Sequence, residues 1–206
     1  MNDFDDQSRI ATYYDRLVDQ YGHDPRACDA SSKTSLTVRY QTLGEVTNLS
    51  GKSILEVGCG FGDLGAYLMQ TYERVRYSGV DISSRMIEEG QRAHPGLHLS
   101  RTNVLDMAPQ QQFDVVLAQG IFYLLGYNAE AKMHRLIEKM FSLATEAVAF
   151  TTISAWASQK GDREFYADPV KLLGWCRQLT PCLVLRHDYH EADFTMYLYK
   201  KRRWLS

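Results

Sequence analysis

The sequence predicts an α/β protein built on one mostly parallel β-sheet. From residue 53 onward, short apolar runs alternate with stretches of helical periodicity, which is the pattern of repeated βαβ units. The runs at 54–57 and 114–117 are almost wholly apolar, as expected for parallel strands buried on both faces. The last two strand-like runs are separated by four residues, which is long enough only for an antiparallel hairpin.

Two helices are expected before the sheet begins. Residues 5–22 place apolar side chains at helical spacing and end at Gly22, and residues 31–49 follow serines that can cap a helix. We interpret residues 1–50 as a helical lid and residues 53–200 as the sheet core of a single domain that spans 1–206.

The remaining elements follow in βαβ order. We expect strands at 53–57, 75–81, 97–102, 113–119 and 147–154, with helices at 63–72, 84–93 and 130–145 between them. A helix at 168–179 begins with Asp168 as its cap and Pro169 at its first position. Strands at 182–189 and 194–200 complete the sheet. The first five strands are predicted to be parallel and the sheet to close with an antiparallel edge.

Composition and charge exclude several classes of protein. The net charge of −2 provides no basic surface for nucleic acid or an anionic membrane. No stretch approaches the ~20 apolar residues that cross a bilayer. The four cysteines form no CxxC pair and no histidines cluster at ligand spacing, so we expect no metal site and a cytoplasmic protein with reduced thiols.

A glycine-rich turn follows the first strand, and two motifs overlap in it. Residues 60–65 spell GxGxxG with Asp81 following 21 residues after Gly60, which matches the dinucleotide-binding pattern. Residues 56–62 spell ExGxGxG, and here Gly58 follows the strand directly. The acidic Glu56 suits a ligand with an ammonium group better than a pyrophosphate. The second motif therefore favours S-adenosylmethionine (SAM).

Four segments resemble the class I SAM-dependent methyltransferases. They are ILEVGCGFGDLGAYL at the first strand, VDIS after the second, NVLD after the third and FDVVLAQGIFYLL at the fourth. They occur in the family's order, and the resemblance covers about residues 53–200. It implies a Rossmann-like sheet of seven strands with helices on both faces and the last strand antiparallel. It also implies SAM as the cofactor.

The resemblance assigns roles by position. Gly58, Gly60 and Gly62 would line the methionine part of SAM, and Glu56 would organise the loop. Asp81 would accept hydrogen bonds from the ribose hydroxyls. The residues expected around the adenine are Ile82, Val104, Leu105 and Asp106. Gln119 and Gly120 would contact the methionine moiety where an acceptor arrives. Alternatively, Asp81 could only cap the following helix and Asp106 could lie in a solvated turn.

Aromatic and basic side chains provide further candidates. The chain has 13 tyrosines, and aromatic faces stabilise a sulfonium by cation–π attraction. We take Tyr14, Gln119, Tyr123 and Tyr166 as candidate catalytic residues. Arg39 is the candidate for holding the SAM carboxylate, because a guanidinium binds a carboxylate bidentately; the alternative is an exposed surface arginine.

Three functions remain open. The first is methyl transfer to a small molecule by in-line displacement at the sulfonium. The second follows from resemblance to small bacterial methyltransferase-like proteins, whose fold relatives include synthases that cyclise SAM to azetidine-2-carboxylate and release methylthioadenosine. The third is a non-catalytic regulator that binds the cofactor. The expected partner is a small-molecule acceptor or none, with no nucleic acid or membrane, and the protein is expected to be a monomer or a homodimer.

Overall fold

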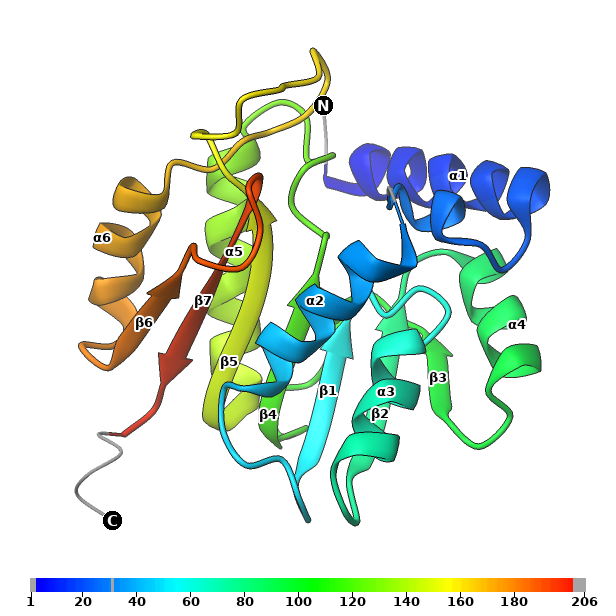
Figure 1. The fold of residues 1–206 in the computed structure, drawn as a ribbon, viewed down its shortest axis with the longest axis horizontal. Helices are drawn as coiled ribbons and strands as arrows, with labels where there is room; N and C mark the ends of the chain where they lie inside the picture. The colour runs from blue at the N-terminus through cyan, green and yellow to red at the C-terminus, as the bar shows by residue number, and fades with distance from the viewer. Residues whose placement is uncertain (1–2, 31, 202–206) are drawn as a thin grey trace.

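A seven-stranded sheet forms the centre of the molecule in the computed structural model, which describes residues 3–30 and 32–201 (Figure 1). The strands are β1 Ser53–Val57, β2 Arg76–Asp81, β3 His98–Arg101, β4 Phe113–Gln119, β5 Ala144–Ile153, β6 Leu183–Arg186 and β7 Asp193–Tyr199. Their order in the sheet is β3-β2-β1-β4-β5-β7-β6. The pairs among β1 to β5 are parallel, and β7 is antiparallel to both of its neighbours.

The helices connect the strands and cover both faces of the sheet. They are α1 Asp3–Tyr21, α2 Lys33–Gly44, α3 Asp63–Thr71, α4 Ser84–Ala93, α5 Ala129–Leu143 and α6 Pro169–Leu179, with short 3-10 turns η1 Pro25–Cys28 and η2 Val104–Asp106. The predicted seven-stranded α/β fold is therefore confirmed.

Alternation along the strands divides the core into two layers. In β4, Val115 and Leu117 pack with buried residues of α2 and α3, whereas Val116 and Ala118 pack with those of α5 and α6. Successive side chains of a strand point to opposite faces of the sheet. Because helices cover both faces, both sets of side chains are buried, and the strand needs a nearly all-apolar run.

Some element ends differ from the prediction. Helix α2 ends at Gly44, well before residue 49, yet Val46 and Leu49 beyond it are fully buried. Strand β5 begins at Ala144, because that residue already pairs with Phe113 ahead of an irregularity in β4. The predicted antiparallel edge is confirmed: β7 lies between β5 and β6, and β6 is the outermost strand.

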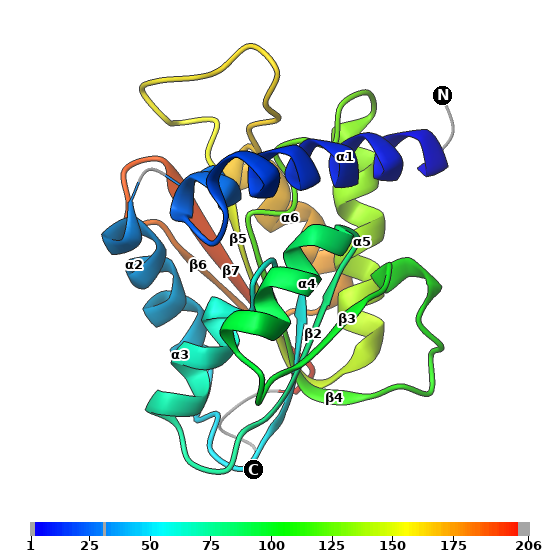
Figure 2. The same cartoon turned by 90° about the vertical axis from the view of Figure 1, so that its right-hand side faces the viewer.

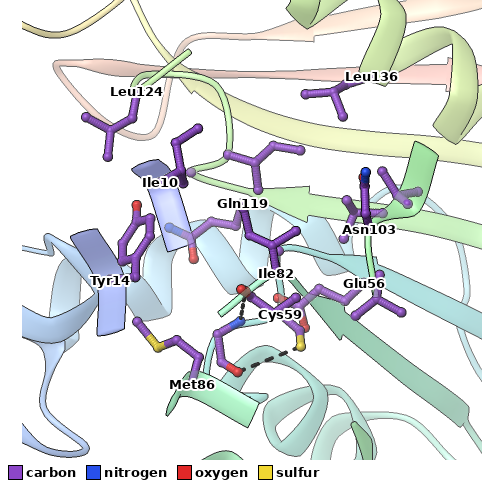
Figure 3. Close-up of a pocket in the computed structure, with 18 of the residues that line it drawn as sticks. Ile10, Tyr14, Glu56, Cys59, Ile82, Met86, Asn103, Gln119, Leu124 and Leu136 are labelled. Carbon is purple, nitrogen blue, oxygen red and sulfur yellow. Dashed lines mark hydrogen bonds between the residues drawn. The ribbon is translucent and has the colours of Figure 1, made fainter. Parts of the chain in front are cut away.

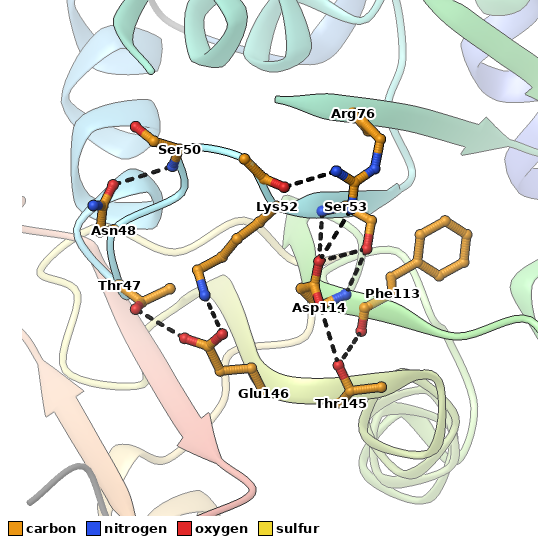
Figure 4. Close-up of polar contacts among 11 residues, drawn as sticks. Thr47, Asn48, Ser50, Lys52, Ser53, Arg76, Phe113, Asp114, Thr145 and Glu146 are labelled. Carbon is orange, nitrogen blue, oxygen red and sulfur yellow. Dashed lines mark hydrogen bonds and ion pairs between the residues drawn. The ribbon is translucent and has the colours of Figure 1, made fainter. Parts of the chain in front are cut away.

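Polar contacts join the amino-terminal ends of the strands (Figure 4). The Asp114 carboxylate accepts hydrogen bonds from the backbone N–H and the hydroxyl of Ser53, each at 2.7 Å. Lys52 pairs with Glu146, which also accepts from Thr47. These contacts hold β1, β4 and β5 together at the end of the sheet opposite to the glycine-rich turn. No helix in the described part of the chain is both long and apolar enough to cross a bilayer.

Candidate functional site

A pocket opens at the carboxyl ends of β1, β2 and β4, where the glycine-rich turn lies (Figure 3). The turn needs glycine because Gly58, Gly60 and Gly62 all have positive φ, at 69°, 52° and 82°. Gly58 also passes close to the segment after β4, since a Cβ on it would lie 2.2 Å from Cγ2 of Ile121. The glycine-rich turn thus forms a closely packed floor of the pocket, in which backbone groups are accessible to a ligand.

Asp81 ends β2 and connects three parts of this floor. One carboxylate oxygen accepts from the Gly60 N–H at 2.9 Å, and the other accepts from the Ser83 N–H at 2.8 Å. Burial raises the pKa of this carboxyl, although the backbone hydrogen bonds oppose the shift. A carboxylate has about four acceptor positions, so two remain for a ligand in the pocket.

Glu56 lies in β1 beside the turn and is 3% exposed. The Tyr77 hydroxyl donates a hydrogen bond to its carboxylate. The pKa of Glu56 is raised to about 8, chiefly by burial and also by the neighbouring acids Asp63 and Asp81, although the Tyr77 hydrogen bond opposes the shift. Three carboxyls, Glu56, Asp63 and Asp81, therefore line one pocket, which favours a cationic ligand.

Helix α1 crosses above the carboxyl ends of the strands (Figure 2), and its Ile10 and Tyr14 line the pocket (Figure 3). Its Asp15 accepts from the Ser83 hydroxyl at 2.6 Å and from the Arg85 N–H at 3.2 Å, which fixes α1 at the start of α4. The Tyr14 hydroxyl bonds to that of Tyr123, after β4. Tyr123 donates to Asp29 at 3.0 Å, and Tyr13 donates to the same oxygen at 2.6 Å.

Most of the predicted site residues line this pocket. They are Tyr14, Glu56, Gly58, Gly60, Asp81, Ile82, Val104, Leu105, Gln119 and Gly120. Residues from five segments far apart in the chain therefore meet at one place. Their roles toward a ligand remain predictions.

Arg39 and Asp106 are not brought to the pocket. The guanidinium of Arg39 donates to the buried carboxylate of Asp193 at 2.5 Å and to Ser35 at 2.7 Å, so it faces these residues and is not exposed on the surface. Its role toward the SAM carboxylate stays a prediction. The Asp106 side chain is exposed at the end of η2. Asn103 lines the pocket near this turn instead, and its amide donates to Gln7 of α1 at 3.1 Å.

Three other predicted residues are placed around the pocket and not among its lining side chains. Gly62 caps the start of α3. Tyr123 reaches the pocket only through its bond to Tyr14. The Tyr166 hydroxyl bonds to Glu164 and accepts from the Gly161 N–H at 2.7 Å, within its own loop. Tyr166 therefore lies outside the candidate site.

Sequence reasoning missed several lining residues. They include Gln7, Ile10, Cys28, Tyr40, Phe61, Asp63, Met86, Asn103, Ile121, Leu124, Lys132 and Arg135. Asp63 had a usable signal, since it is the first residue of a helix that follows a glycine turn. Phe61, Asn103, Ile121 and Leu124 lie within the segments that carry the methyltransferase resemblance. The remaining residues arrive from α1, η1, α2, α4 and α5 by tertiary packing, and no local pattern marks them.

Comparison with known proteins agrees with this fold. A family model described as a methyltransferase domain matches residues 55–147. Magnesium protoporphyrin IX methyltransferase of Synechocystis PCC 6803, solved with bound SAH, superposes with a TM-score of 0.69 over 95% of this chain and 100% of its own, at 15% identity. The chain is therefore similar to methyltransferases over residues 55–147 and has the class I methyltransferase fold.

Further similar proteins extend the comparison. A candidate methyltransferase of Mycobacterium tuberculosis, Rv1506c, is 26% identical over 155 residues, which is 72% of this chain and 93% of the relative. The [4+2]-cyclase SpnF superposes with a TM-score of 0.65 at 16% identity, over 87% of this chain and 74% of its own. The chain spans only 33–39% of the length of further curated methyltransferases that it matches.

Proposed function

We propose that the protein binds SAM in this pocket and transfers its methyl group to a small molecule. The observation that supports this most strongly is the convergence of the glycine turn, Glu56 and Asp81 on one cavity at the carboxyl ends of the strands. Open α/β sheets bind ligands at this edge, where the strand order reverses direction between β1 and β4.

The lining residues fit the parts of SAM in order. Asp81 has two free acceptor positions for the ribose hydroxyls. Ile82, Val104 and Leu105 provide apolar surface for the adenine, next to Asn103. At the turn, the positive φ of Gly58 and Gly60 lets the backbone approach the methionine portion, and the buried Glu56 carboxyl lies beside it as a hydrogen-bond acceptor for the ammonium.

The chemistry requires alignment more than acid or base groups. When bound, SAM supplies a methyl group on a positively charged sulfur, which is already an activated leaving group. The protein must orient an acceptor in line with that bond and exclude water. Tyr14, Tyr40 and Phe61 line the pocket, and their rings can stabilise a sulfonium.

The pocket favours a small and partly apolar acceptor. Ile10, Ile121, Leu124 and Leu136 contribute apolar lining beside Gln119. No histidine occurs among the lining residues of the described chain. We therefore expect an acceptor whose nucleophile is already ionised or uncharged and reactive, because a histidine general base is not available to it.

A second candidate function is cyclisation of SAM itself, and the closed lid favours it. The bonds among Tyr14, Tyr123 and Asp29 join α1 to the segment after β4, where an acceptor would enter. In this reaction the substrate's amine attacks its own γ-carbon, the bond from that carbon to sulfur breaks, and methylthioadenosine leaves. The amine must first lose a proton, and Glu56, with its pKa raised to about 8 by burial, is matched to accept it. The fold allows this alternative, since SpnF is a cyclase with the same fold.

Product analysis separates these functions. The protein is incubated with SAM alone and with a panel of small carboxylic acids, amines and phenols, and the products are identified by mass spectrometry. Methyl transfer predicts S-adenosylhomocysteine (SAH) only when an acceptor is present. Cyclisation predicts methylthioadenosine and azetidine-2-carboxylate from SAM alone. Binding of SAM with no product in any mixture would contradict both and favour a regulator.

A further inference from the structure

Two histidines and one aspartate meet beside the pocket in an arrangement that the proposed function does not use. Nε2 of His23 lies 2.9 Å from one carboxylate oxygen of Asp63, and Nε2 of His94 lies 2.8 Å from the same oxygen. One ligand atom from each of the three residues lies within 4.8 Å of those of the other two. Sequence spacing alone predicts no such site, because the histidines are 40 and 31 positions from Asp63.

Each residue is positioned by the end of a different helix. Gly22, with a φ of 62°, ends α1 and turns the chain so that His23 packs on Phe61, with ring centroids 4.5 Å apart. Asp63 is the first residue of α3, and His94 follows the last residue of α4. The two imidazole rings are nearly perpendicular, with centroids 5.7 Å apart.

Within residues 3–30 and 32–201, the hydrogen-bond partners of the Asp63 carboxylate are these two imidazoles. Among the described residues, no lysine or arginine forms an ion pair with it. Both rings direct Nε2 toward the same oxygen, so two neutral donors and one anionic donor face a common point. A cation at that point would be coordinated by all three groups.

We propose that His23, Asp63 and His94 bind a divalent transition metal ion, with Zn²⁺ as the best match. Imidazole nitrogen and carboxylate oxygen are both zinc ligands, at about 2.0–2.2 Å, so two ligand atoms of a tetrahedral site lie about 3.4 Å apart. The His–Asp separations of 2.8 and 2.9 Å would need to widen by only about 0.5 Å, which small side-chain rotations provide.

The site leaves room for a fourth ligand. The side chains of His23, Asp63 and His94 are 34%, 33% and 23% exposed, so water can complete a tetrahedral set. Each imidazole would give its Nε2 lone pair to the metal and carry its proton on Nδ1, and a neutral ring therefore loses no proton on binding. The metal would join the end of α1 to α3 and α4 directly beside the pocket, which Asp63 also lines.

Zinc titration of the full-length protein tests the proposal. After dialysis against a chelator, the protein is titrated with ZnCl₂ by calorimetry, and its melting temperature is measured with and without Zn²⁺. We expect one ion per chain and a higher melting temperature. His23→Gln and His94→Gln should each weaken binding by about 100-fold or more, since each removes a ligand. Co²⁺ should give the visible absorption of a tetrahedral site only in the wild-type protein.

Matched variants control for other ligands and for misfolding. His98→Gln removes an exposed histidine in β3 and should bind zinc as the wild type does. The melting temperature of each variant without metal reports whether it folds. Absence of zinc binding in the wild-type protein would overturn the proposal. Unchanged affinity in both His23→Gln and His94→Gln would also overturn it, because the ion would then be bound elsewhere.

Discussion

Glu56 shows how burial can make a single carboxyl respond to pH. Its pKa is raised from 4.5 to about 8 because it is buried beside other acids. The unfolded chain releases this proton near pH 4.5, whereas the folded protein keeps it to about pH 8. The stability contribution of Glu56 is therefore fully present below pH 4.5 and is lost as the pH rises to about 8.

Replacement of Glu56 by glutamine should remove this loss of stability with rising pH. Relative to the wild type, Glu56→Gln should gain up to about 1.4 kcal/mol in free energy of unfolding for each pH unit between pH 5 and 8. Urea unfolding at several pH values measures the difference, with the exposed Glu130→Gln as a control for removal of one carboxylate. A difference that stays constant with pH would show that Glu56 is ionised in the folded protein.

Gly58 is the position where backbone geometry constrains the site most. An added Cβ would lie 2.2 Å from Cγ2 of Ile121 on a backbone with a φ of 69°. Gly58→Ala should lower the free energy of unfolding by about 1–3 kcal/mol, because it adds both strain and overlap. Thermal or urea unfolding measures this change.

Gly174 offers a matched comparison for the same substitution. It lies in the middle of α6, and no atom lies within 4 Å of its would-be Cβ. Gly174→Ala should therefore stabilise the protein, since alanine favours a helix interior. Equal effects of the two substitutions would contradict the close approach at Gly58.

Single residues were predictable where their role depends on local order in the chain. Asp81 ends a strand and lines the pocket, as its place in the sequence predicts, but the cap of α4 is Ser83 and not Asp81. The role of Asp81 toward a ribose stays a prediction. Arg39 was not predictable, because its partner Asp193 lies 154 positions away. The donor set of His23, Asp63 and His94 was missed for the same reason.

At the scale of elements, α1 lies beside the pocket and is held there by side-chain contacts. Asp15 fixes it to α4, and Tyr14 bonds to Tyr123 after β4. Val18 packs with Ala27, Phe61 and Met86 in a small separate core. This core is much smaller than the two that cover the sheet, so we expect α1 to open before the sheet unfolds.

Removal of one hydroxyl tests this lid. Tyr123→Phe deletes the bonds to Tyr14 and Asp29 and should destabilise the closed lid by about 0.5–1.5 kcal/mol. Hydrogen exchange should accelerate in α1 and remain unchanged in β1 and β4. Tyr127→Phe, at a tyrosine that is 74% exposed, is the matched control. No change in α1 exchange for Tyr123→Phe would mean that other contacts close the lid.

The bounds of a helix or strand could be predicted where its hydrophobic periodicity defines them. The bounds of β1, β4 and α4 are as expected, because each has a clear apolar pattern and a turn or cap at its ends. The ends of α2 and β6 differ, since tertiary packing and edge position decide where those elements stop. The order of β6 and β7 in the sheet depends on a long-range pairing that periodicity does not encode.

At the scale of the whole molecule, the contacts that join the strands and the residues of the candidate site lie at opposite ends of the sheet. The amino-terminal ends of β1, β4 and β5 are joined by Ser53–Asp114 and Lys52–Glu146 contacts. At the opposite ends, the strands leave backbone groups and carboxylates facing a pocket under α1. The sheet thus holds the candidate site on rigid strands while the cover remains a separate element.

Calorimetric titration with SAH tests the central claim, because SAH resembles SAM and is not consumed. The account predicts one SAH per chain. Asp81→Ala should weaken binding by about 1–3 kcal/mol through loss of hydrogen bonds to a charged group. Asp106→Ala changes an exposed acid outside the pocket and should leave the affinity unchanged. Absence of SAH binding, or equal affinity in the wild type and Asp81→Ala, would contradict the account.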